Sequence, residues 1–367
     1  MTSNLTVVTV VDSISTTSMP INEFVFYRNR EGFGYREILL VCDDTIPENV
    51  SVPKSIKVYL VGTSRKKIRN VTKNILNNVE SNSGKYVFHM HAQKSAILFL
   101  IATIGLGIRK KTLFTIHSTF SSRNFKYKIS SCFCVLMSHF ANCVSYSALN
   151  EYASWVKILK GRKLIAIPNG VDISRIRKAV KNLPDHKNIA NSNILVCVGR
   201  IIPIKNQEFL IKLMPYLPNS KLILIGAEDN NYNMHELAER LNVANRIDFL
   251  GLKPRDEVFK ILNTCGIYIS SSTIEGLPVS VLEAMCIGLL PIVSNIEPHM
   301  EIAKKCGTIK TLPLEAHVWI DNIRLYQELS NSNLCKISDT IKESVRRNYS
   351  LESMHNEYNK IYKQLTM

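Results

Sequence analysis

Acidic residues are scarce in one long stretch of this 367-residue sequence. Residues 51–200 contain 25 Lys and Arg but only 4 Asp and Glu, which leaves an excess of 21 positive charges, whereas the whole chain carries +16. A field of this size attracts anionic partners. Charge alone therefore leaves nucleic acid, anionic lipid and phosphorylated substrates open.

Long hydrophobic runs and disulfide spacings are also absent. The longest strongly apolar run, residues 96–107, is well short of the roughly 20 residues that span a bilayer. The N-terminus has no basic stretch typical of a signal peptide. The nine cysteines are odd in number, show no C-x-x-C spacing and lie mostly in apolar runs. We therefore expect a folded cytoplasmic protein with buried thiols.

Short β-branched runs alternate with amphipathic stretches along the chain, which is typical of parallel sheets with crossover helices. The predicted strands are residues 7–11, 38–41, 58–61, 86–89, 113–116 and 164–167 in the first half and 194–198, 222–225, 247–250, 267–270 and 290–293 in the second. Helices are predicted at 207–214, 234–241, 256–262 and 279–285. The pattern predicts an α/β fold with two Rossmann-like doubly wound domains that face a central cleft.

A turn cluster at residues 167–172 separates the two halves, and we place the domain boundary there. The prediction is an N-terminal domain at 1–170, a C-terminal domain at 171–345 and a last segment at 346–367. This segment has an apolar stripe at helical spacing, so we expect a helix that packs back on the N-terminal domain. Open α/β sheets bind ligands at the carboxyl ends of their strands, so the loops after strands are the expected site.

Two glutamates lie just after the predicted strand 267–270. Glu275 ends the loop, and Gly276 permits close approach of the backbone. The helix that begins near Val279 offers N–H groups and a positive dipole end to a phosphate. Glu283, about one turn into this helix, is placed to bind a ribose diol, and Glu275 to bind sugar hydroxyls. An acidic helix start that only favours capping is the alternative interpretation.

A short basic loop follows the predicted strand 194–198 and contains Gly199, Arg200 and Lys205. Arg offers a rigid fork of donors and Lys a mobile point charge, so this pair suits a departing diphosphate. The alternative interpretation is a solvated basic loop.

These motifs resemble those of family 4 of the retaining glycosyltransferases, which have the GT-B fold. The resemblance is carried by Gly199-Arg200 with Lys205, by Glu275-Gly-Leu-Pro-x4-Glu283-Ala-Met and by Pro168-Asn-Gly-Val-Asp172, and it extends over residues from about 164 to 310.

The family resemblance implies a role for each motif residue. It implies that Arg200 and Lys205 hold the donor diphosphate. It also implies that Glu275 contacts the donor sugar and that Glu283 binds the ribose. The backbone N–H groups that approach the phosphates would be those of Leu277 and Val279, because Pro278 has none.

The first half resembles the family more loosely. Thr115-Ile-His117 is similar to the family's Thr-x-His element, whose histidine reaches the donor sugar, and the strand end at His91 is similar to its Val-His-x-His element. The family usually has a glycine-rich loop after the first strand, but residues 12–20 contain no glycine. Either hydroxyls replace the backbone contacts to the donor phosphate or the loop serves the acceptor. The hydroxyls in question are those of Ser15, Thr16, Thr17 and Ser18.

Basic clusters interleaved with aromatic residues also mark the first half. These clusters are Arg65-Lys66-Lys67, Arg109-Lys110-Lys111, Arg123, Lys126 and Lys128. Cations near an anionic leaflet each add about 1 kcal/mol of attraction, so the pattern predicts an N-terminal domain that docks on an anionic membrane surface. A generally basic solvated surface is the alternative.

The resemblance implies a retaining glycosyltransferase that is peripheral on the inner face of the cytoplasmic membrane. It would move a sugar from a nucleotide diphosphate sugar to a lipid diphosphate-linked saccharide in bacterial O-antigen or capsule synthesis, as part of lipopolysaccharide-type assembly. Uracil is the expected base, held by backbone near residues 251–253. No Asp-x-Asp motif lies near either loop, so no divalent metal is expected.

Two alternatives remain at this stage. A nucleotide-sugar epimerase of the same fold would need acid and base carboxylates in the N-terminal domain, where residues 51–150 contain only Glu80 as an acid. A nucleic-acid-binding protein would use the basic charge. The sequence contains no recognisable nucleic-acid module.

Overall fold

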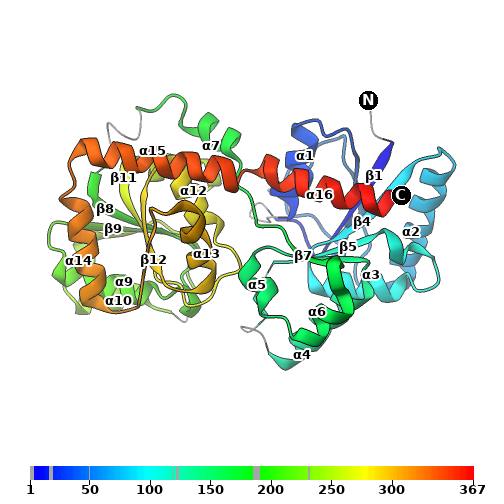
Figure 1. The fold of residues 1–367 in the computed structure, drawn as a ribbon, viewed down its shortest axis with the longest axis horizontal. Coiled ribbons are helices and arrows are strands. Elements are labelled where there is room, and N and C mark those ends of the chain that lie inside the picture. The colour runs from blue at the N-terminus through cyan, green and yellow to red at the C-terminus, as the bar shows by residue number, and fades with distance from the viewer. Residues whose placement is uncertain are drawn as a thin grey trace. The chain divides into compact units, whose positions relative to one another are not determined.

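A computed structural model describes residues 4–15, 20–48, 50–117, 119–120, 124–184, 191–229 and 232–367. The chain divides into two compact units, which we call unit 1 (Met1–Pro168 with Met354–Met367) and unit 2 (Asn169–Ser353). Each unit is built around its own parallel sheet with helices packed around it (Figure 1). The predicted α/β class with two doubly wound sheets is confirmed.

Unit 1 contains a sheet of seven parallel strands in the order β3-β2-β1-β4-β5-β6-β7. The strands are β1 (Leu5–Val11), β2 (Arg36–Val41), β3 (Lys57–Leu60), β4 (Lys85–Met90), β5 (Thr112–Ile116), β6 (Phe140–Cys143) and β7 (Leu164–Ala166). Six of them match predicted strands. Strand β6 was missed because its sequence, Phe-Ala-Asn-Cys, has no β-branched residue to signal a strand.

The helices of unit 1 include the last helix of the chain. They are α1 (Tyr27–Arg30), α2 (Arg65–Glu80), α3 (Gln93–Ala102), α4 (Phe125–Met137), α5 (Tyr146–Asn150), α6 (Ser154–Lys160) and α16 (Leu351–Thr366). Helix α16, red in Figure 1, lies across unit 1 and matches the helix predicted in the segment 346–367. Among the described residues, no helix combines the length and the apolarity needed to cross a membrane.

Unit 2 contains a sheet of six parallel strands in the order β10-β9-β8-β11-β12-β13. The strands are β8 (Asn191–Val198), β9 (Lys221–Ile225), β10 (Ile247–Phe249), β11 (Cys265–Ser270), β12 (Leu290–Ser294) and β13 (Lys310–Leu312). The helices are α7 (Ile173–Val180), α9 (Gln207–Leu213), α10 (Met234–Arg240), α11 (Arg255–Thr264), α12 (Val279–Ile287), α13 (Glu297–Cys306), α14 (Ala316–Gln327) and α15 (Asn331–Asn348).

Both sheets reverse their strand order beside their first strand. In unit 1, β1 pairs with β2 on one side and with β4 on the other, and in unit 2, β8 pairs with β9 and β11. Loops that leave the two central strands at such a switch point diverge and leave room for a ligand. Strand β1 is mostly apolar and every one of its residues is buried, since helices cover both faces of a parallel sheet.

A buried ion pair holds helix α16 to the sheet of unit 1. The guanidinium of Arg28, which is 1% exposed, lies with Nε 2.7 Å from Oε1 of Glu37 and Nη2 2.9 Å from Oε2. Its Nη1 donates to the hydroxyl of Tyr362 on α16 at 3.0 Å. Burial alone would lower the pKa of Arg28, but Glu37, through its charge and its hydrogen bonds, together with Tyr362 and Tyr35 outweighs burial and raises it. Removing one partner of such a buried ion pair costs about 3–5 kcal/mol, and the hydrogen bond from Arg28 to Tyr362 ties α16 to this pair.

Buried histidines extend this polar network. In His89, Nδ1 lies 2.7 Å from the hydroxyl of Tyr362, and Nε2 lies 2.7 Å from Oγ1 of Thr115. In His355, Nε2 lies 2.7 Å from the backbone oxygen of Glu23. Burial lowers the pKa of His89 well below its usual range and that of His355 to about 3. Both rings are therefore neutral at pH 7.

The neutral buried histidines predict that the protein loses stability in mild acid. Their pKa values are near 6.5 in the unfolded chain and lower in the folded one, so the unfolded state binds more protons below pH 6.5. The contribution of these histidines to the free energy of unfolding is therefore fully present above pH 6.5, and it decreases as the pH falls toward 4. Urea unfolding between pH 7 and 4 would measure this slope. A free energy of unfolding that stays constant over this range would contradict it.

Two single variants separate buried from exposed histidines in that measurement. His355→Phe removes one buried ring and is expected to lower the proton uptake on unfolding near pH 5 by about one proton. His317→Phe is the matched control, because the side chain of His317 is 77% exposed. The control should leave the slope unchanged.

Candidate functional site

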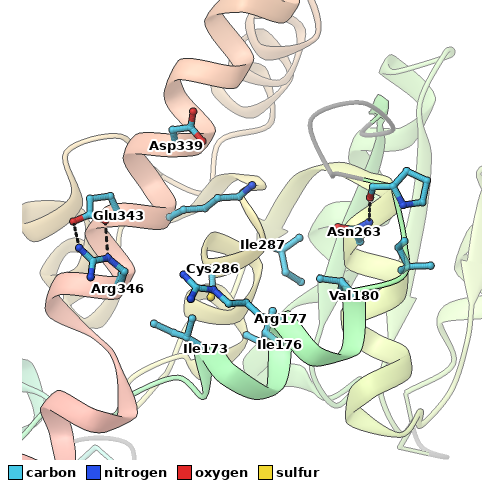
Figure 2. A pocket seen from close by; sticks show the side chains of 13 residues that line it. Ile173, Ile176, Arg177, Val180, Asn263, Cys286, Ile287, Asp339, Glu343 and Arg346 are labelled. Atoms are coloured by element: carbon cyan, nitrogen blue, oxygen red, sulfur yellow. Dashed lines mark hydrogen bonds and ion pairs between the residues drawn. The ribbon is translucent and has the colours of Figure 1, made fainter.

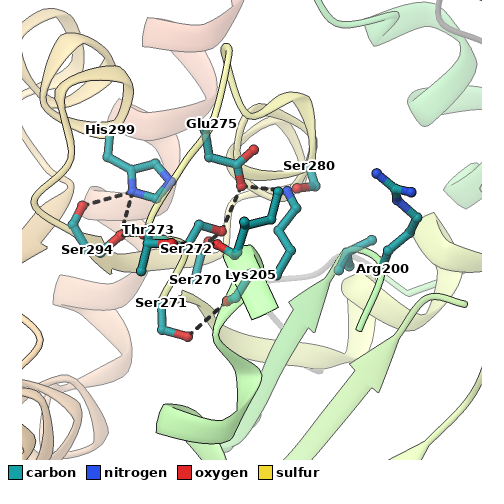
Figure 3. Close-up of polar contacts among 12 residues, drawn as sticks. Arg200, Lys205, Ser270, Ser271, Ser272, Thr273, Glu275, Ser280, Ser294 and His299 are labelled. Carbon is teal, nitrogen blue, oxygen red and sulfur yellow. Dashed lines mark hydrogen bonds and ion pairs between the residues drawn. The ribbon is translucent and has the colours of Figure 1, made fainter. Parts of the chain in front are cut away.

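The switch point of unit 2 brings together the two loops that the sequence singled out. Strands β8 and β11 are parallel neighbours, so their carboxyl ends lie at one edge of the sheet. The loop after β8 carries Lys205, and the loop after β11 carries Glu275. Nζ of Lys205 lies 2.5 Å from Oε1 of Glu275, and the two side chains are 21% and 11% exposed (Figure 3).

Hydrogen bonds between the two loops fix this ion pair. The backbone N–H of Thr273 donates to the oxygen of Ile204 at 2.9 Å, and the hydroxyl of Ser271 donates to the oxygen of Asn206 at 2.7 Å. The hydroxyl of Ser272 donates to Oε1 of Glu275 at 2.7 Å. The glutamate therefore accepts from a cation and from a hydroxyl, both held by the same pair of loops.

A third loop supports the basic loop and was missed at the sequence level. Gly226 follows β9, and a Cβ at this position would lie 2.0 Å from the backbone oxygen of Gly199. The backbone N–H of Ile201 also donates to the oxygen of Ala227 at 2.8 Å. Only glycine permits this approach. The signal in the sequence was a glycine directly after a strand, which is too common to be assigned without the fold.

Helix α12 carries the second glutamate. Glu283 is 6% exposed, and its Oε1 accepts from Nε of Arg255 at 2.6 Å. Arg255 is the first residue of α11 and follows β10, so it also comes from the carboxyl edge of the sheet. Sequence reasoning missed Arg255, because nothing in the sequence separates it from solvated cations such as Lys253.

The start of α12 offers backbone donors beside the ion pair. Pro278 caps the helix and has no N–H, whereas Val279 is in its first turn, where N–H groups have no acceptor within the helix. Leu277 is buried, and Gly276 lies between it and Glu275.

Arg200 and Gly199 take different positions around Lys205. The side chain of Lys205 passes within 3.6 Å of the place where a Cβ on Gly199 would stand. Arg200 is exposed, and Figure 3 shows its side chain standing apart from the pair formed by Lys205 and Glu275. Its backbone oxygen accepts from Nε2 of Gln207 at 2.9 Å. The structure therefore brings Lys205 and Glu275 together and leaves the Arg200 side chain free of this pair.

A buried histidine lies behind the glutamate loop. Nδ1 of His299 lies 2.8 Å from the backbone oxygen of Ser294 and therefore carries the proton, and the Ser294 hydroxyl donates to the oxygen of Ser272. Burial lowers the pKa of His299 to about 4, although Glu275 opposes this change. The chain of contacts from His299 to Glu275 rigidifies the loop, and no sequence motif had marked this residue.

The predicted histidines of unit 1 contact each other. Nδ1 of His91 lies 3.1 Å from Nε2 of His117. The ring of Phe24 packs edge-on against that of His91, with the ring centroids 4.4 Å apart. Burial lowers the pKa of His117 to about 4 and that of His91 well below its usual range. Two neutral rings share one N–H in this contact, so each fixes the tautomer of the other.

The loop after β1 is only partly described. Oδ1 of Asp12 accepts from the backbone N–H of Ser95 at 2.6 Å and so caps the N-terminus of α3. A carboxylate of the protein itself thus occupies that helix end. Thr16, Thr17 and Ser18 lie outside the described residues, so their predicted roles remain predictions.

The basic cluster at residues 109–111 forms a helical turn before β5. Nε and Nη2 of Arg109 donate to the backbone oxygens of Met137 and Leu136, both at 3.0 Å. Arg109 therefore caps the C-terminus of α4. Lys110 is exposed and Lys111 is half-buried.

Unit 2 has a further pocket of about 570 Å³ away from these loops (Figure 2). Cys286 and Ile287 line it at the C-terminal end of α12, whereas the loop with Glu275 precedes the N-terminal end of this helix. Helices α7 and α15 supply most of the remaining walls. None of the predicted site residues lines this pocket.

Comparison with known sequences identifies relatives with one kind of activity. Residues 180–317 match the family described as glycosyl transferases group 1. The UDP-Gal:alpha-D-GlcNAc-diphosphoundecaprenol alpha-1,3-galactosyltransferase of Escherichia coli is 26% identical over 294 residues, which cover 73% of this chain and 74% of that protein. A glycosyltransferase of Methanocaldococcus jannaschii is 32% identical over 150 residues, which cover 39% of this chain and 36% of that protein.

Solved structures share the whole fold at low sequence identity. Sucrose-phosphate synthase from Thermosynechococcus elongatus has a TM-score of 0.76 at 15% identity, covering 98% of this chain and 99% of that one. Anabaena HepE in complex with UDP and glucose has a TM-score of 0.74 at 16% identity, with the same coverage. Residues 180–317 thus match the group 1 glycosyltransferases, and the chain is a glycosyltransferase of GT-B fold.

Proposed function

We propose that the enzyme transfers a hexosyl group from a UDP-sugar to a lipid diphosphate-linked saccharide, with retention of configuration. The reaction would take place at the inner face of the cytoplasmic membrane, in assembly of a bacterial surface polysaccharide such as O-antigen or capsule. Unit 2 would bind the donor and unit 1 the acceptor. The observation that carries the proposal is the ion pair of Lys205 and Glu275 at the switch point of unit 2.

The relatives support the choice of donor and acceptor. The Escherichia coli relative is named for UDP-galactose as its donor and a diphosphoundecaprenol-linked sugar as its acceptor. HepE, which shares the fold, is known in complex with UDP-glucose.

The donor phosphates would lie at the N-terminus of α12, beside Lys205. An ammonium group has three N–H donors, so Lys205 can contact Glu275 and still donate to a phosphate. Arg200 lies on the same loop and has a long exposed side chain that can turn toward the leaving diphosphate. Charge that develops on the diphosphate is stabilised by these cations and by the N–H groups of α12 near Val279. No divalent cation is needed in this account.

Glu275 would contact the hydroxyls of the transferred sugar. Its carboxylate is oriented by Lys205 and by Ser272, which fixes the position of its free oxygen. As the family resemblance implies, His117 would reach the donor sugar through the ring nitrogen that does not face His91. A phosphate oxygen would accept the proton of the attacking acceptor hydroxyl on the face from which the diphosphate leaves. Attack on that face retains the configuration of the donor.

Glu283 would bind the ribose diol of the nucleotide. Arg255 donates to Oε1 of Glu283 and so orients the carboxylate that would accept from two neighbouring hydroxyls. Hydrogen bonds from hydroxyls to a carboxylate are charge-assisted and therefore strong.

We expect Lys205→Ala and Glu275→Ala each to reduce transfer about a hundredfold or more, because each removes a charged group that contacts the donor during bond cleavage. The measurement is acceptor-dependent release of UDP by the folded variant. Lys212→Ala is a matched control, since its Nζ lies 2.5 Å from Glu208 in an exposed ion pair of the same unit. Near-normal activity of either site variant would refute the assignment.

Glu283→Gln is expected to raise the KM for the donor at least tenfold with a smaller effect on kcat, because ribose binding is similar in the ground state and the transition state. Asp256→Asn is the control. Asp256 is the neighbour of Arg255 in the sequence, and its Oδ1 forms a 2.7 Å ion pair with Nε of Arg175 that the substitution removes. An unchanged donor KM for Glu283→Gln would exclude the ribose role.

The product linkage is expected to keep the anomeric configuration of the donor, and the rate should persist in excess EDTA. Proton NMR of the product gives the configuration directly. Inversion would contradict the mechanism, and loss of activity rescued by Mn²⁺ would contradict the metal-free account. Interconversion of UDP-sugars without an acceptor would instead identify an epimerase.

A further inference from the structure

Helix α6 in unit 1 turns an apolar face outward. Trp155, Ile158 and Leu159 are 53%, 78% and 69% exposed, and their spacing places them on one side of the helix. On the other side, Val156 is fully buried and Nζ of Lys160 donates to the backbone oxygen of Ser138. A surface helix of a globular protein normally shows the reverse arrangement.

Helix α4 packs next to α6 and also exposes large apolar side chains (Figure 1). Phe125 and Ile129, one turn apart on α4, are 76% and 56% exposed. We call the five side chains Phe125, Ile129, Trp155, Ile158 and Leu159 the α4–α6 face. Apolar groups gathered on neighbouring helices mark an interaction surface more often than scattered exposed residues do.

Positive charge is concentrated in the part of the chain that carries this face. Residues 103–163 contain ten Lys and Arg and a single acidic residue, Glu151. Burial and the nearby cations Arg109 and Lys163 lower the pKa of Lys160 to about 8. The pKa of His139 is also lowered, mainly by burial and then by the nearby cations Lys163, Lys160, Lys110 and Arg109. The cations are therefore close enough to repel one another at the end of α6.

We propose that the α4–α6 face docks the enzyme on an anionic phospholipid bilayer. Exposed tryptophan and aliphatic side chains suit the boundary between headgroups and acyl chains, and the surrounding cations suit lipid phosphates. A nucleic acid would use the cations but not the apolar side chains. This inference rests on the proposed lipid-linked acceptor, and it names the surface that gives unit 1 access to it.

The α4–α6 face adds exposed apolar side chains to the basic clusters that the sequence analysis assigned to membrane docking. The guanidinium of Arg109 is bound to backbone oxygens of α4, so it supplies charge without being free to reach a headgroup. The exposed cations Arg162 and Lys163 directly follow α6. The apolar side chains of α6 and these two cations thus lie within one short segment.

The full-length enzyme with vesicles of 30% phosphatidylglycerol in phosphatidylcholine tests the inference. Trp155 is a built-in reporter, because the sequence has two tryptophans and the other, Trp319, is fully buried. Vesicles should shift the tryptophan emission to the blue, and Trp155→Phe should abolish the shift while binding persists. Pure phosphatidylcholine should bind at least tenfold more weakly, and salt should weaken binding to the anionic vesicles.

The double variant Ile158→Ser with Leu159→Ser should bind anionic vesicles at least tenfold more weakly. Both side chains are exposed, so the variant should fold normally. Leu325→Ser in unit 2 is the matched control, since Leu325 is 58% exposed, and it should bind like the wild type. Arg162→Gln with Lys163→Gln should lower the salt-sensitive part of binding. Wild-type binding by the first variant would overturn the proposal.

Transfer assays and sedimentation distinguish a failure of the docking proposal from a failure of the proposed function. Transfer to a short water-soluble acceptor analogue should be equal in the wild type and the Ile158/Leu159 variant, while transfer to a lipid acceptor in vesicles should fall tenfold. Lys205→Ala should lose transfer to both the soluble and the lipid acceptor, which tests the proposed function independently of docking. Sedimentation without vesicles tests a second copy as the occupant. A wild-type dimer that the double variant abolishes, with no vesicle binding, would overturn the inference.

Discussion

Parallel strand pairing at the two switch points is the constraint on which the rest of this structure depends. Because β8 and β11 run side by side in the same direction, residues that follow them meet at one edge, although about 70 positions separate them in the sequence. The contact between Lys205 and Glu275 results from this pairing and from the hydrogen bonds that tie the two loops. In unit 1, the same arrangement places Asp12 and His91 after neighbouring strands.

Buried polar groups give unit 1 its specificity at a cost in desolvation. Arg28 and Glu37 are withdrawn from water together, and they are tolerated because each charge is paired and hydrogen-bonded. Tyr362 and His89 extend the network from α16 into the sheet. The end of the chain is therefore held by directional contacts as well as by apolar packing, and its histidines remain neutral.

Charge and apolar exposure are coupled in unit 1. The excess of positive charge is costly to the folded state, since like charges repel, and such a surface is retained where an anionic partner offsets the repulsion. The α4–α6 face places apolar side chains among these cations. Unit 2 shows the contrasting arrangement, because two cations of its site, Lys205 and Arg255, each contact a glutamate.

The sequence determined the α/β class, most of the strands and the two loops of the donor site, because strand period and loop position depend on local residues. It did not reveal β6, Arg255, Gly226 or His299. Their roles come from contacts between segments far apart in the chain, and no local pattern distinguishes a paired arginine from a solvated one. The outward apolar face of α6 was also decided only by tertiary structure. Helical spacing groups Trp155 with Ile158 and Leu159, but packing decides whether such a face turns to the core or to solvent.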